Sequence, residues 1–276
     1  MLIIFIIHDT ILNIKHERRV KGMGHTIALL SRKGGAGKSS TVSAIAAGVK
    51  GRGYRVLVCD VDGQANTSYT MRAETGGPTL YDVLIGTVPA SEAIQHTEAG
   101  DIIPASQELD MTEARMKGAG REFRLRDALE SVKGNYDFIV LDTAPAFGVL
   151  TVNALAAASG VVIPLQADVW SLTGLQQLGE LIEATKRSMN PALTVCGLLL
   201  TRFNRRNILS RDLTDAFEKA ASGMGTRLFS ASIRECVAVK ESQVRRRDIF
   251  SYAPHSNAAQ DYGAFVDELL AVMKGV

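Results

Sequence analysis

One glycine-rich segment constrains the fold more than any other part of the chain: residues 32–40, which read RKGGAGKSS. A short apolar run of strand type, residues 25–31, precedes it, and residues 41–50 repeat apolar side chains at helical spacing. A strand, a glycine loop and a helix together form the context that a phosphate-binding loop requires. The glycines let backbone N–H groups point at an anion, and the helix N-terminus adds partial positive charge. The segment therefore predicts a binding site for the phosphates of a nucleotide.

The side chains of this loop predict how phosphates and a metal ion are held. We expect Lys38 to contact the outer phosphates and Ser39 to hold Mg2+. The common pattern G-x-x-x-x-G-K-[ST] has a glycine where this chain has Arg32, and a second lysine, Lys33, stands beside it. A glycine-rich turn with two solvated lysines is the alternative, but the flanking strand and helix argue against it. The rest of the expected phosphate-binding set is Gly34, Gly35, Ala36, Gly37 and Ser40.

The order K-G-G-x-G-K-S resembles the deviant Walker A loop of the ParA/MinD family of ATPases. Further likeness, including the C-terminal third, extends over about residues 25–274. The resemblance implies that Lys33 reaches across a dimer interface to the nucleotide of the partner subunit, and so acts in catalysis with Lys38. It also implies ATP and Mg2+ as cofactors, slow Mg-dependent hydrolysis of ATP to ADP and phosphate, and a homodimer with ATP between its subunits.

Strand-like and helix-like segments alternate from residue 25 onward. Their apolar runs are continuous, which is typical of a mainly parallel sheet covered by helices on both faces. No repeat or linker divides them, so we expect a single α/β domain, residues 23–276, with a twisted sheet and the P-loop NTPase fold. Strands are predicted at 25–31, 54–60, 101–105, 136–142, 160–166 and 193–201, and helices near 38–51, 122–133, 149–159, 171–189 and 210–222.

Both ends of the chain bear on membrane contact. Residues 1–7 are strongly apolar, but a bilayer span needs about 20 residues. No positive residue precedes this run and no small-residue cleavage site follows it, which argues against a signal peptide. We expect residues 1–22 to be an extension outside the fold; a membrane-touching tail is the alternative. The amphipathic segment 264–274 carries Asp267 and Glu268 against one lysine, so we expect it to dock on the protein core.

Carboxylates follow two of the predicted strands. Ligands of open parallel sheets bind at the carboxyl ends of strands, where Asp60, Asp62 and Asp142 fall. Asp142 follows four apolar residues and is placed as a Walker B carboxylate that contacts Mg2+ directly or through water.

Residues 60–68 resemble the first switch of the same family. The resemblance implies that Asp62 is catalytic, positioning or activating the attacking water, and that it lies with Ser39 and Asp142 around the metal. Gly63 and Ala65 replace a proline and a glycine of the family pattern, so the sequence does not secure the geometry of this loop. An exposed carboxylate pair in a turn is the alternative for Asp60 and Asp62.

Charge narrows the possible contacts with nucleic acid. Lys and Arg number 31 against 29 Asp and Glu, so any such contact must come from a local patch. The resemblance implies nonspecific DNA binding through basic C-terminal residues, by phosphate contacts that weaken with salt. It also implies that Asn204 meets adenine. Ordinary solvated arginines are the alternative to the expected DNA-binding set: Arg205, Arg206, Arg234, Arg245, Arg246 and Arg247.

Together these expectations describe an ATP-dependent dimerising switch for partitioning a plasmid, chromosome or mobile element. A ParB-like centromere-binding partner would stimulate its hydrolysis. Three widely spaced cysteines without metal-ligand spacing indicate reduced thiols, and the resemblance implies a cytoplasmic, nucleoid-associated protein with no membrane partner. The alternative is a ParA-like positioning ATPase for a non-DNA cargo, such as a protein cluster or conjugation apparatus. A metabolic P-loop enzyme is a third class, for which the sequence shows no small-molecule motif.

Overall fold

A sheet of eight strands runs through the part of the chain that the computed structural model describes, residues 24–204 and 208–274. The strands are β1 His25–Leu29, β2 Val56–Val61, β3 Gln95–Thr97, β4 Gly100–Ile103, β5 Phe138–Thr143, β6 Gly160–Gln166, β7 Thr194–Phe203 and β8 Ile233–Arg234. Their order across the sheet is β3-β4-β2-β5-β1-β6-β7-β8. Only the pairing of β3 with β4 is antiparallel within these residues. The first strand of the chain therefore lies in the middle of a parallel sheet, and the loop after it opens at the centre of the strand ends.

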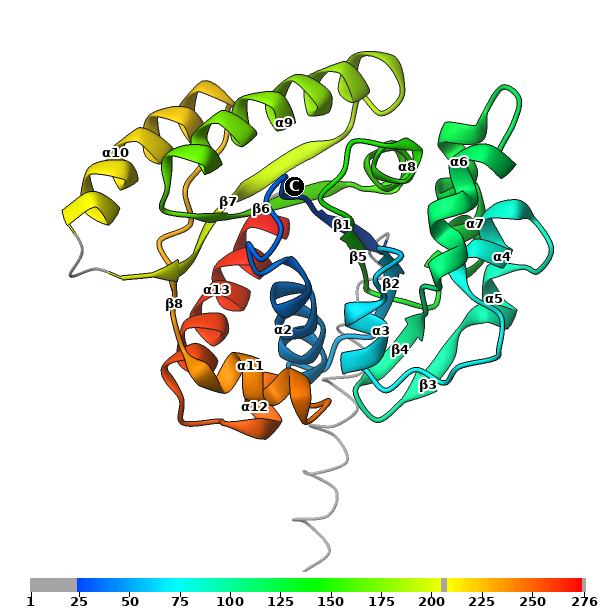
Figure 1. Cartoon of the computed structure of the whole chain (residues 1–276), viewed down its shortest axis with the longest axis horizontal. Helices are drawn as coiled ribbons and strands as arrows, with labels where there is room; N and C mark the ends of the chain where they lie inside the picture. Colours follow the sequence, from blue (N-terminus) through cyan, green and yellow to red (C-terminus); the bar gives the residue numbers. More distant parts are fainter. Residues whose placement is uncertain (1–23, 205–207, 275–276) are drawn as a thin grey trace, which may run out of the picture.

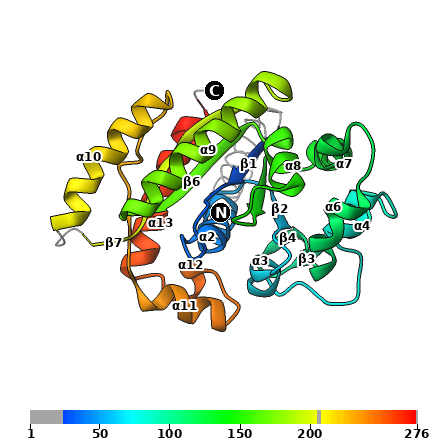
Figure 2. The ribbon, with the colours of Figure 1, turned by 45° about the horizontal axis from the view of Figure 1, so that its top comes forward.

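Helices cover both faces of this sheet, as Figures 1 and 2 show. One face carries α2 Lys38–Gly51, α11 Val237–Val244, α12 Ile249–Tyr252 and α13 Asn257–Met273. The other carries α4 Leu80–Ile85, α5 Ala90–Ala93, α7 Arg124–Lys133, α8 Val149–Ala157, α9 Val169–Ser188 and α10 Ile208–Gly223. Two short helices, α3 Asn66–Thr70 and α6 Thr112–Arg115, and two 3-10 turns, Gln107–Met111 and Arg121–Phe123, lie in the connections.

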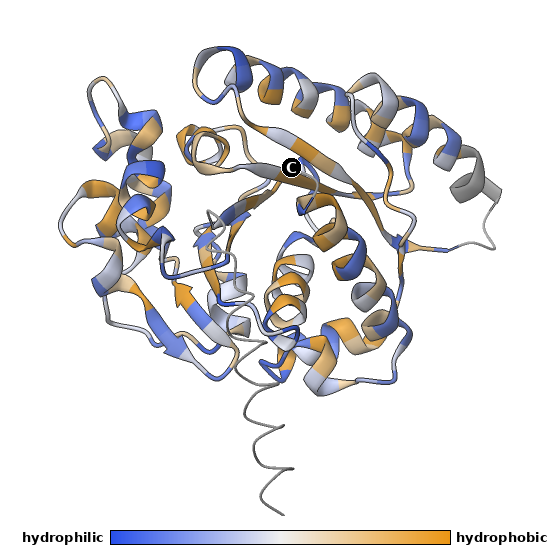
Figure 3. Cartoon of the chain, turned by 180° about the vertical axis from the view of Figure 1, so that it is seen from behind, coloured by the Kyte–Doolittle hydropathy of each residue, from blue (hydrophilic) through white to orange (hydrophobic). Residues whose placement is uncertain are grey.

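Successive residues of the central strand β1 pack into the hydrophobic cores on opposite faces of the sheet, which explains its unbroken apolar sequence. Ile27 and Leu29 pack with α2 and α13, whereas Ala28 belongs to the core under α8 and α9. Successive side chains of a strand point to opposite faces, so a strand buried on both sides needs apolar residues at every position. Figure 3 shows the complementary pattern in the helices, whose ribbons are banded by hydrophobic and hydrophilic residues.

The predicted fold class is confirmed, and each predicted strand and helix has a counterpart in the structure. The sequence analysis missed β3, β8 and several short helices, whose lengths of two to eight residues are too short to show a clear period. The extension predicted at 1–22 lies outside the described residues. No described helix has the length and apolar character needed to span a bilayer.

The C-terminal helix docks on the protein core, as its sequence predicted. The side chains of Phe265, Val266 and Leu269, which belong to α13, are buried in the core. Its two acidic residues bind the protein itself: Arg52 donates to Asp267 at 2.7 Å, and Glu268 accepts from the backbone N–H of Ser230 at 2.9 Å. The charges that argued against a membrane helix therefore anchor α13 to its own domain.

Candidate functional site

The loop between β1 and α2 has the backbone of an anion-binding turn. Gly35 and Gly37 adopt φ values of +75° and +83°, in the left-handed region that glycine enters without strain. Gly37 is the N-cap of α2, and no side chain caps that helix end. The first N–H groups of α2 are therefore left for a ligand in front of the loop. Thr201 of β7 supports the turn by donating to the carbonyl of Ala36 at 2.8 Å.

A cavity of about 730 Å³ opens in front of this loop. Its walls come from residues 34–40, from residues 62–70, from the ends of β7 and β8, and from α11. Its volume lies in the range of about 300–1,000 Å³ that is usual for ligand pockets. The cavity lies at the carboxyl ends of the strands, where α/β sheets bind their ligands.

Lys38 is a buried cation at the floor of this cavity. Its residue is 7% exposed, and its Nζ donates to the carbonyl of Ser31 at 3.4 Å. Burial lowers the pKa of Lys38, while the charges of Asp142 and Asp62 act in the opposite direction. A buried ammonium group is stable only beside negative charge, which the phosphates of a nucleotide would supply.

Asp142 offers an oxygen atom that suits a metal ion. Thr67 donates to its Oδ2 at 2.6 Å, and Ser39 also hydrogen-bonds to its side chain. Its Oδ1 is buried and has no hydrogen-bond partner in the described structure. Burial raises the pKa of Asp142, although the hydrogen bonds from Thr67 and Ser39 and the charge of Lys38 oppose this. An oxygen without a partner beside a serine hydroxyl fits Mg2+, which prefers hard oxygen ligands and would hold the carboxylate ionised.

Asp60 lies beside Asp142 on the neighbouring strand and anchors the loop after β2. The two are register partners of β2 and β5, and Asp60 is fully buried. It accepts hydrogen bonds from the N–H and hydroxyl of Ser68, at 2.8 and 2.7 Å, and from the N–H of Asp62 at 3.3 Å. Burial first, and then the charge of Asp142, raise its pKa to about 7. Asp60 is therefore a supporting residue of the site, a role that its sequence position alone did not reveal.

Asp62 lies between the anchoring carboxylates and the cavity. It is half-buried, lines the cavity, and accepts from the N–H of Gln64 at 3.0 Å. Asp60 accepts from the N–H of Asp62 and so holds the backbone that keeps Asp62 at the cavity wall. This is the placement expected of a carboxylate that orients a water molecule in front of the loop.

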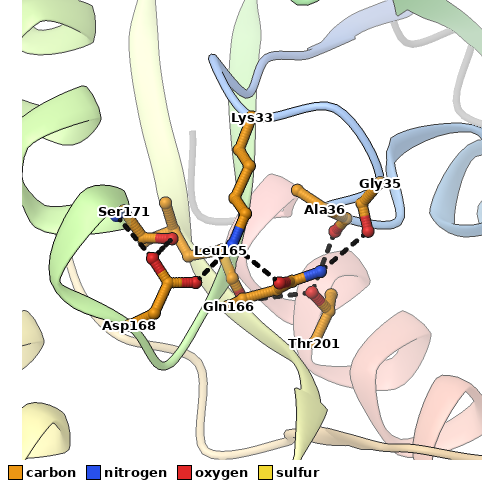
Figure 4. A network of polar contacts seen from close by, with 8 residues as sticks. All are labelled: Lys33, Gly35, Ala36, Leu165, Gln166, Asp168, Ser171 and Thr201. Atoms are coloured by element: carbon orange, nitrogen blue, oxygen red, sulfur yellow. Dashed lines mark hydrogen bonds and ion pairs between the residues drawn. The ribbon is translucent and has the colours of Figure 1, made fainter.

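Lys33 lies outside the cavity and binds within its own chain (Figure 4). Its Nζ donates to Gln166 Oε1 at 3.0 Å and to Asp168 Oδ2 at 2.7 Å. Gln166 in turn donates to the carbonyl of Gly35 at 2.8 Å, and Asp168 caps α9 by accepting from the N–H of Ser171. Burial acts to raise the pKa of Asp168, but the bonds from Lys33 and Ser171 lower it overall. No sequence pattern pointed to Asp168, whereas Gln166 could have been found from its position at a strand end.

The arginines expected to bind DNA have different surroundings. Arg234 forms an ion pair with Asp261 through its Nε and Nη2 atoms, at 2.7 to 3.1 Å, and Arg247 donates to the carbonyl of Ser251 at 2.8 Å. Arg245 is exposed, and Arg246 contacts Tyr69. Two further members of the set, Arg205 and Arg206, lie outside the described residues. Asn204, expected at adenine, is exposed just after β7.

These features define a class: P-loop nucleotide-binding proteins with a buried loop lysine and a carboxylate at a strand end. The AAA_31 family model, described as an AAA domain, matches residues 24–195, which is more than half of the chain. The chain is 34% identical over 252 residues to the chromosome partitioning protein ParA of Caulobacter vibrioides, covering 89% of this chain and 93% of that protein. It belongs to the ParA/MinD family of deviant Walker A ATPases.

Two other comparisons show the range of similar proteins. The cell division protein PomZ of Myxococcus xanthus is 32% identical over 254 residues, covering 90% of this chain and 79% of that protein. The crystal structure of cobyrinic acid a,c-diamide synthase from Mycobacterium smegmatis, with bound ADP and magnesium, superposes with a TM-score of 0.77 at 30% identity. That match covers 91% of this chain and 96% of the synthase chain.

Proposed function

We propose that this protein is an ATP-dependent dimerising switch that partitions DNA. The observation that carries the proposal is that two lysines of one loop differ in burial and position. Lys38 is buried at the cavity floor, whereas Lys33 stands outside the cavity with a side chain that is 40% exposed. A cation in that second position supports a role at a nucleotide that a second subunit holds.

The site would bind MgATP through residues of a single chain. Lys38 and the N–H groups of α2 would hold the phosphates, and Ser39 and Asp142 would hold Mg2+, as the buried Oδ1 of Asp142 supports. When bound, Mg2+ neutralises charge that develops on the phosphates during transfer. Asp62 would orient the attacking water from the wall of the cavity. The synthase structure with ADP and magnesium supports this choice of ligands.

Pairing of two subunits would complete the site. Lys33 would leave Gln166 and Asp168 and contact the nucleotide of the partner subunit. Both present contacts are with half-buried or exposed groups, and exposed ion pairs contribute only about 0–1 kcal/mol, so the exchange costs little. Pairing would then depend on ATP, because each triphosphate supplies the charge that Lys33 needs.

The cargo is proposed to be DNA, bound without sequence preference. The ParA relative supports this, as do the exposed arginines that follow α11, Arg245 and Arg247. A ParB-like centromere-binding protein would stimulate hydrolysis and release the DNA. The PomZ relative supports the second candidate, a positioning ATPase with the same chemistry and a different cargo.

Sedimentation with ATP, with ADP, and of Asp62→Ala with ATP, each with and without duplex DNA, tests these proposals together. We expect a doubled mass with ATP and with Asp62→Ala, and co-sedimentation with DNA of unrelated sequences only in those two states. Pairing without DNA binding would favour the positioning ATPase. Nucleotide binding with neither pairing nor DNA binding would contradict both and would favour a metabolic enzyme like the synthase.

A further inference from the structure

Two helices that are distant in sequence, α3 and α11, end beside each other at the wall of the nucleotide cavity. The Nε of Arg246, which follows α11, donates to the carbonyl of Tyr69 in α3 at 2.7 Å. Its guanidinium also stacks on the Tyr69 ring, 4.7 Å from the ring centroid. In return, the Nε of Arg72, which follows α3, donates to the carbonyl of Arg246 at 3.1 Å. Each arginine thus binds the end of the other helix.

Both arginines occupy backbone positions where glycine is the usual residue. Arg72 and Arg246 have φ values of +60° and +53°. Each is the left-handed residue that closes a helix, since Arg72 N–H donates to Tyr69 at 3.1 Å and Arg246 N–H to Gln243 at 3.0 Å. Glycine adopts this conformation without strain, whereas a residue with a Cβ atom does not. What arginine provides there, and glycine cannot, is the side chain that joins the two helices.

The same two helices are bonded to the phosphate and metal site. The two residues before Tyr69 bind the buried carboxylates: Thr67 donates to Asp142, and Ser68 donates to Asp60. On the other helix, Gln243 donates to the hydroxyl of Ser40 in the phosphate loop at 3.0 Å. The residues around the phosphate and metal site are therefore linked to the arginine run 245–247 through hydrogen bonds of α3 and α11.

We propose that Tyr69, Arg72 and Arg246 form a latch that transmits nucleotide occupancy from α3 to the arginine run 245–247. Arg246 is then a positioning residue: its guanidinium holds α3, and Arg245 and Arg247 are the side chains presented outward. Any displacement of residues 62–68 on nucleotide binding moves the Tyr69 carbonyl, and Arg246 follows it. The inference rests on the proposed function in one respect: it takes DNA to be the ligand whose affinity depends on the position of residues 245–247.

A pair of conservative variants separates the effect of the Arg246 contacts from the effect of positive charge alone. Arg246→Lys and Arg245→Lys both keep the positive charge, but lysine has neither the planar stack nor the fixed Nε donor of arginine. The measurement is the affinity of a fluorescent duplex of arbitrary sequence for the full chain, with Mg and a non-hydrolysable ATP analogue and with MgADP. We expect the ratio of the two affinities to fall about tenfold in Arg246→Lys, a size usual for allosteric coupling, and to stay within about twofold in Arg245→Lys. An unchanged ratio in Arg246→Lys overturns the latch.

Hydrogen exchange without DNA decides the proposal even if the protein binds no DNA. In the wild type, adding the Mg-bound ATP analogue should slow amide exchange in peptides covering residues 66–72 and 244–248. In Arg246→Lys the effect should remain in the first peptide and be much smaller in the second, which keeps only the link from Gln243 to Ser40. An equal response of both peptides in that variant contradicts the latch. Wild-type protein that shows the exchange response but binds no DNA would contradict the proposed cargo and support the latch.

The variant Arg246→Gly distinguishes a role of Arg246 in transmitting nucleotide binding from a role in the stability of the fold. Glycine relieves the left-handed backbone at position 246, so the melting temperature should not fall, while the response of residues 244–248 to nucleotide should be much smaller. A variant that loses stability but retains the response would show that Arg246 has only a structural role.

Discussion

The two halves of the phosphate loop are built differently. The second half, Lys38–Ser40, begins α2 and lies against Asp142, the buried carboxylate at the end of β5. The first half, Arg32 and Lys33, is held by side chains of β6 and α9: Lys33 by Gln166 and Asp168, and Arg32 by a hydrogen bond to Gln177. Lys38 is 7% exposed, whereas the Lys33 side chain is 40% exposed.

This difference indicates which contacts can be exchanged. A buried charge that loses its partners costs several kcal/mol, about 3–5, whereas a half-exposed pair contributes about 0–1 kcal/mol. The second half is therefore suited to a permanent role within one chain, and the first to contacts that are made and broken. The following predictions test that division, beginning with the largest expected effect.

Lys38→Ala should abolish nucleotide binding. The substitution removes the buried lysine of the cavity, and losing one partner of a buried charge pair costs about 2–5 kcal/mol, or at least about 30-fold in affinity. Calorimetric titration with a non-hydrolysable ATP analogue and Mg2+ measures the loss. Lys33→Ala is the matched control and should bind within about threefold of wild type below the concentration at which subunits pair. Equal losses in both variants would contradict the comparison.

Asp62→Ala should stop hydrolysis without preventing binding. A positioned carboxylate contributes about 100-fold or more to proton transfer, so ATP turnover should fall by at least that factor. The nucleotide contacts of Lys38 and Ser39 remain, so ATP should still bind and still cause pairing. Release of phosphate, measured beside sedimentation of the same samples, tests both parts. Turnover at the wild-type rate would remove Asp62 from the mechanism.

Asp168→Asn should make pairing easier. Asparagine caps a helix about as well as aspartate, so α9 keeps its N-terminal hydrogen bond while the ion pair to Lys33 is lost. Because an exposed ion pair is worth about 0–1 kcal/mol, ATP-dependent pairing should occur at up to about fivefold lower protein concentration. Analytical ultracentrifugation over a dilution series gives this value. A shift to higher concentration would show that Asp168 also serves the paired state.

Asp60→Asn should flatten the dependence of stability on pH. The pKa of Asp60 is raised to about 7 in the folded chain, and an unfolded aspartate titrates near 3.9. At pH values between these two, Asp60 holds a proton in the folded state that it lacks in the unfolded state, and this proton stabilises the fold. The stabilisation is full below about pH 4 and is lost as pH rises through about 7. Urea unfolding at pH 5 and pH 8, without nucleotide or Mg2+, should show a smaller decline for Asp60→Asn than for wild type. Equal declines would mean that Asp60 does not titrate in this range.

The buried half of the site was predictable from sequence, because each of its parts follows a recognisable strand. The phosphate loop lies between one strand and one helix, Asp142 follows an apolar run, and the carboxyl ends of parallel strands meet at one edge of the sheet. The exchangeable half was not predictable, since Lys33 meets Gln166 and Asp168 more than 130 positions away. The contact of Arg246 with Tyr69 spans 177 positions and has no periodic signal. Side-chain pairs of this kind follow from the packing of whole elements.

The edges of the sheet limit how two copies of this molecule could meet. One edge strand, β3, has three residues, and the other, β8, has two. Long open edges invite another chain to extend the sheet, and short ones discourage it. Association by β-augmentation is thus disfavoured at both sides, and the pairing proposed above uses the loop-bearing rim at the strand ends instead. If subunits pair as proposed, the small molecule bound at that rim would determine the quaternary structure.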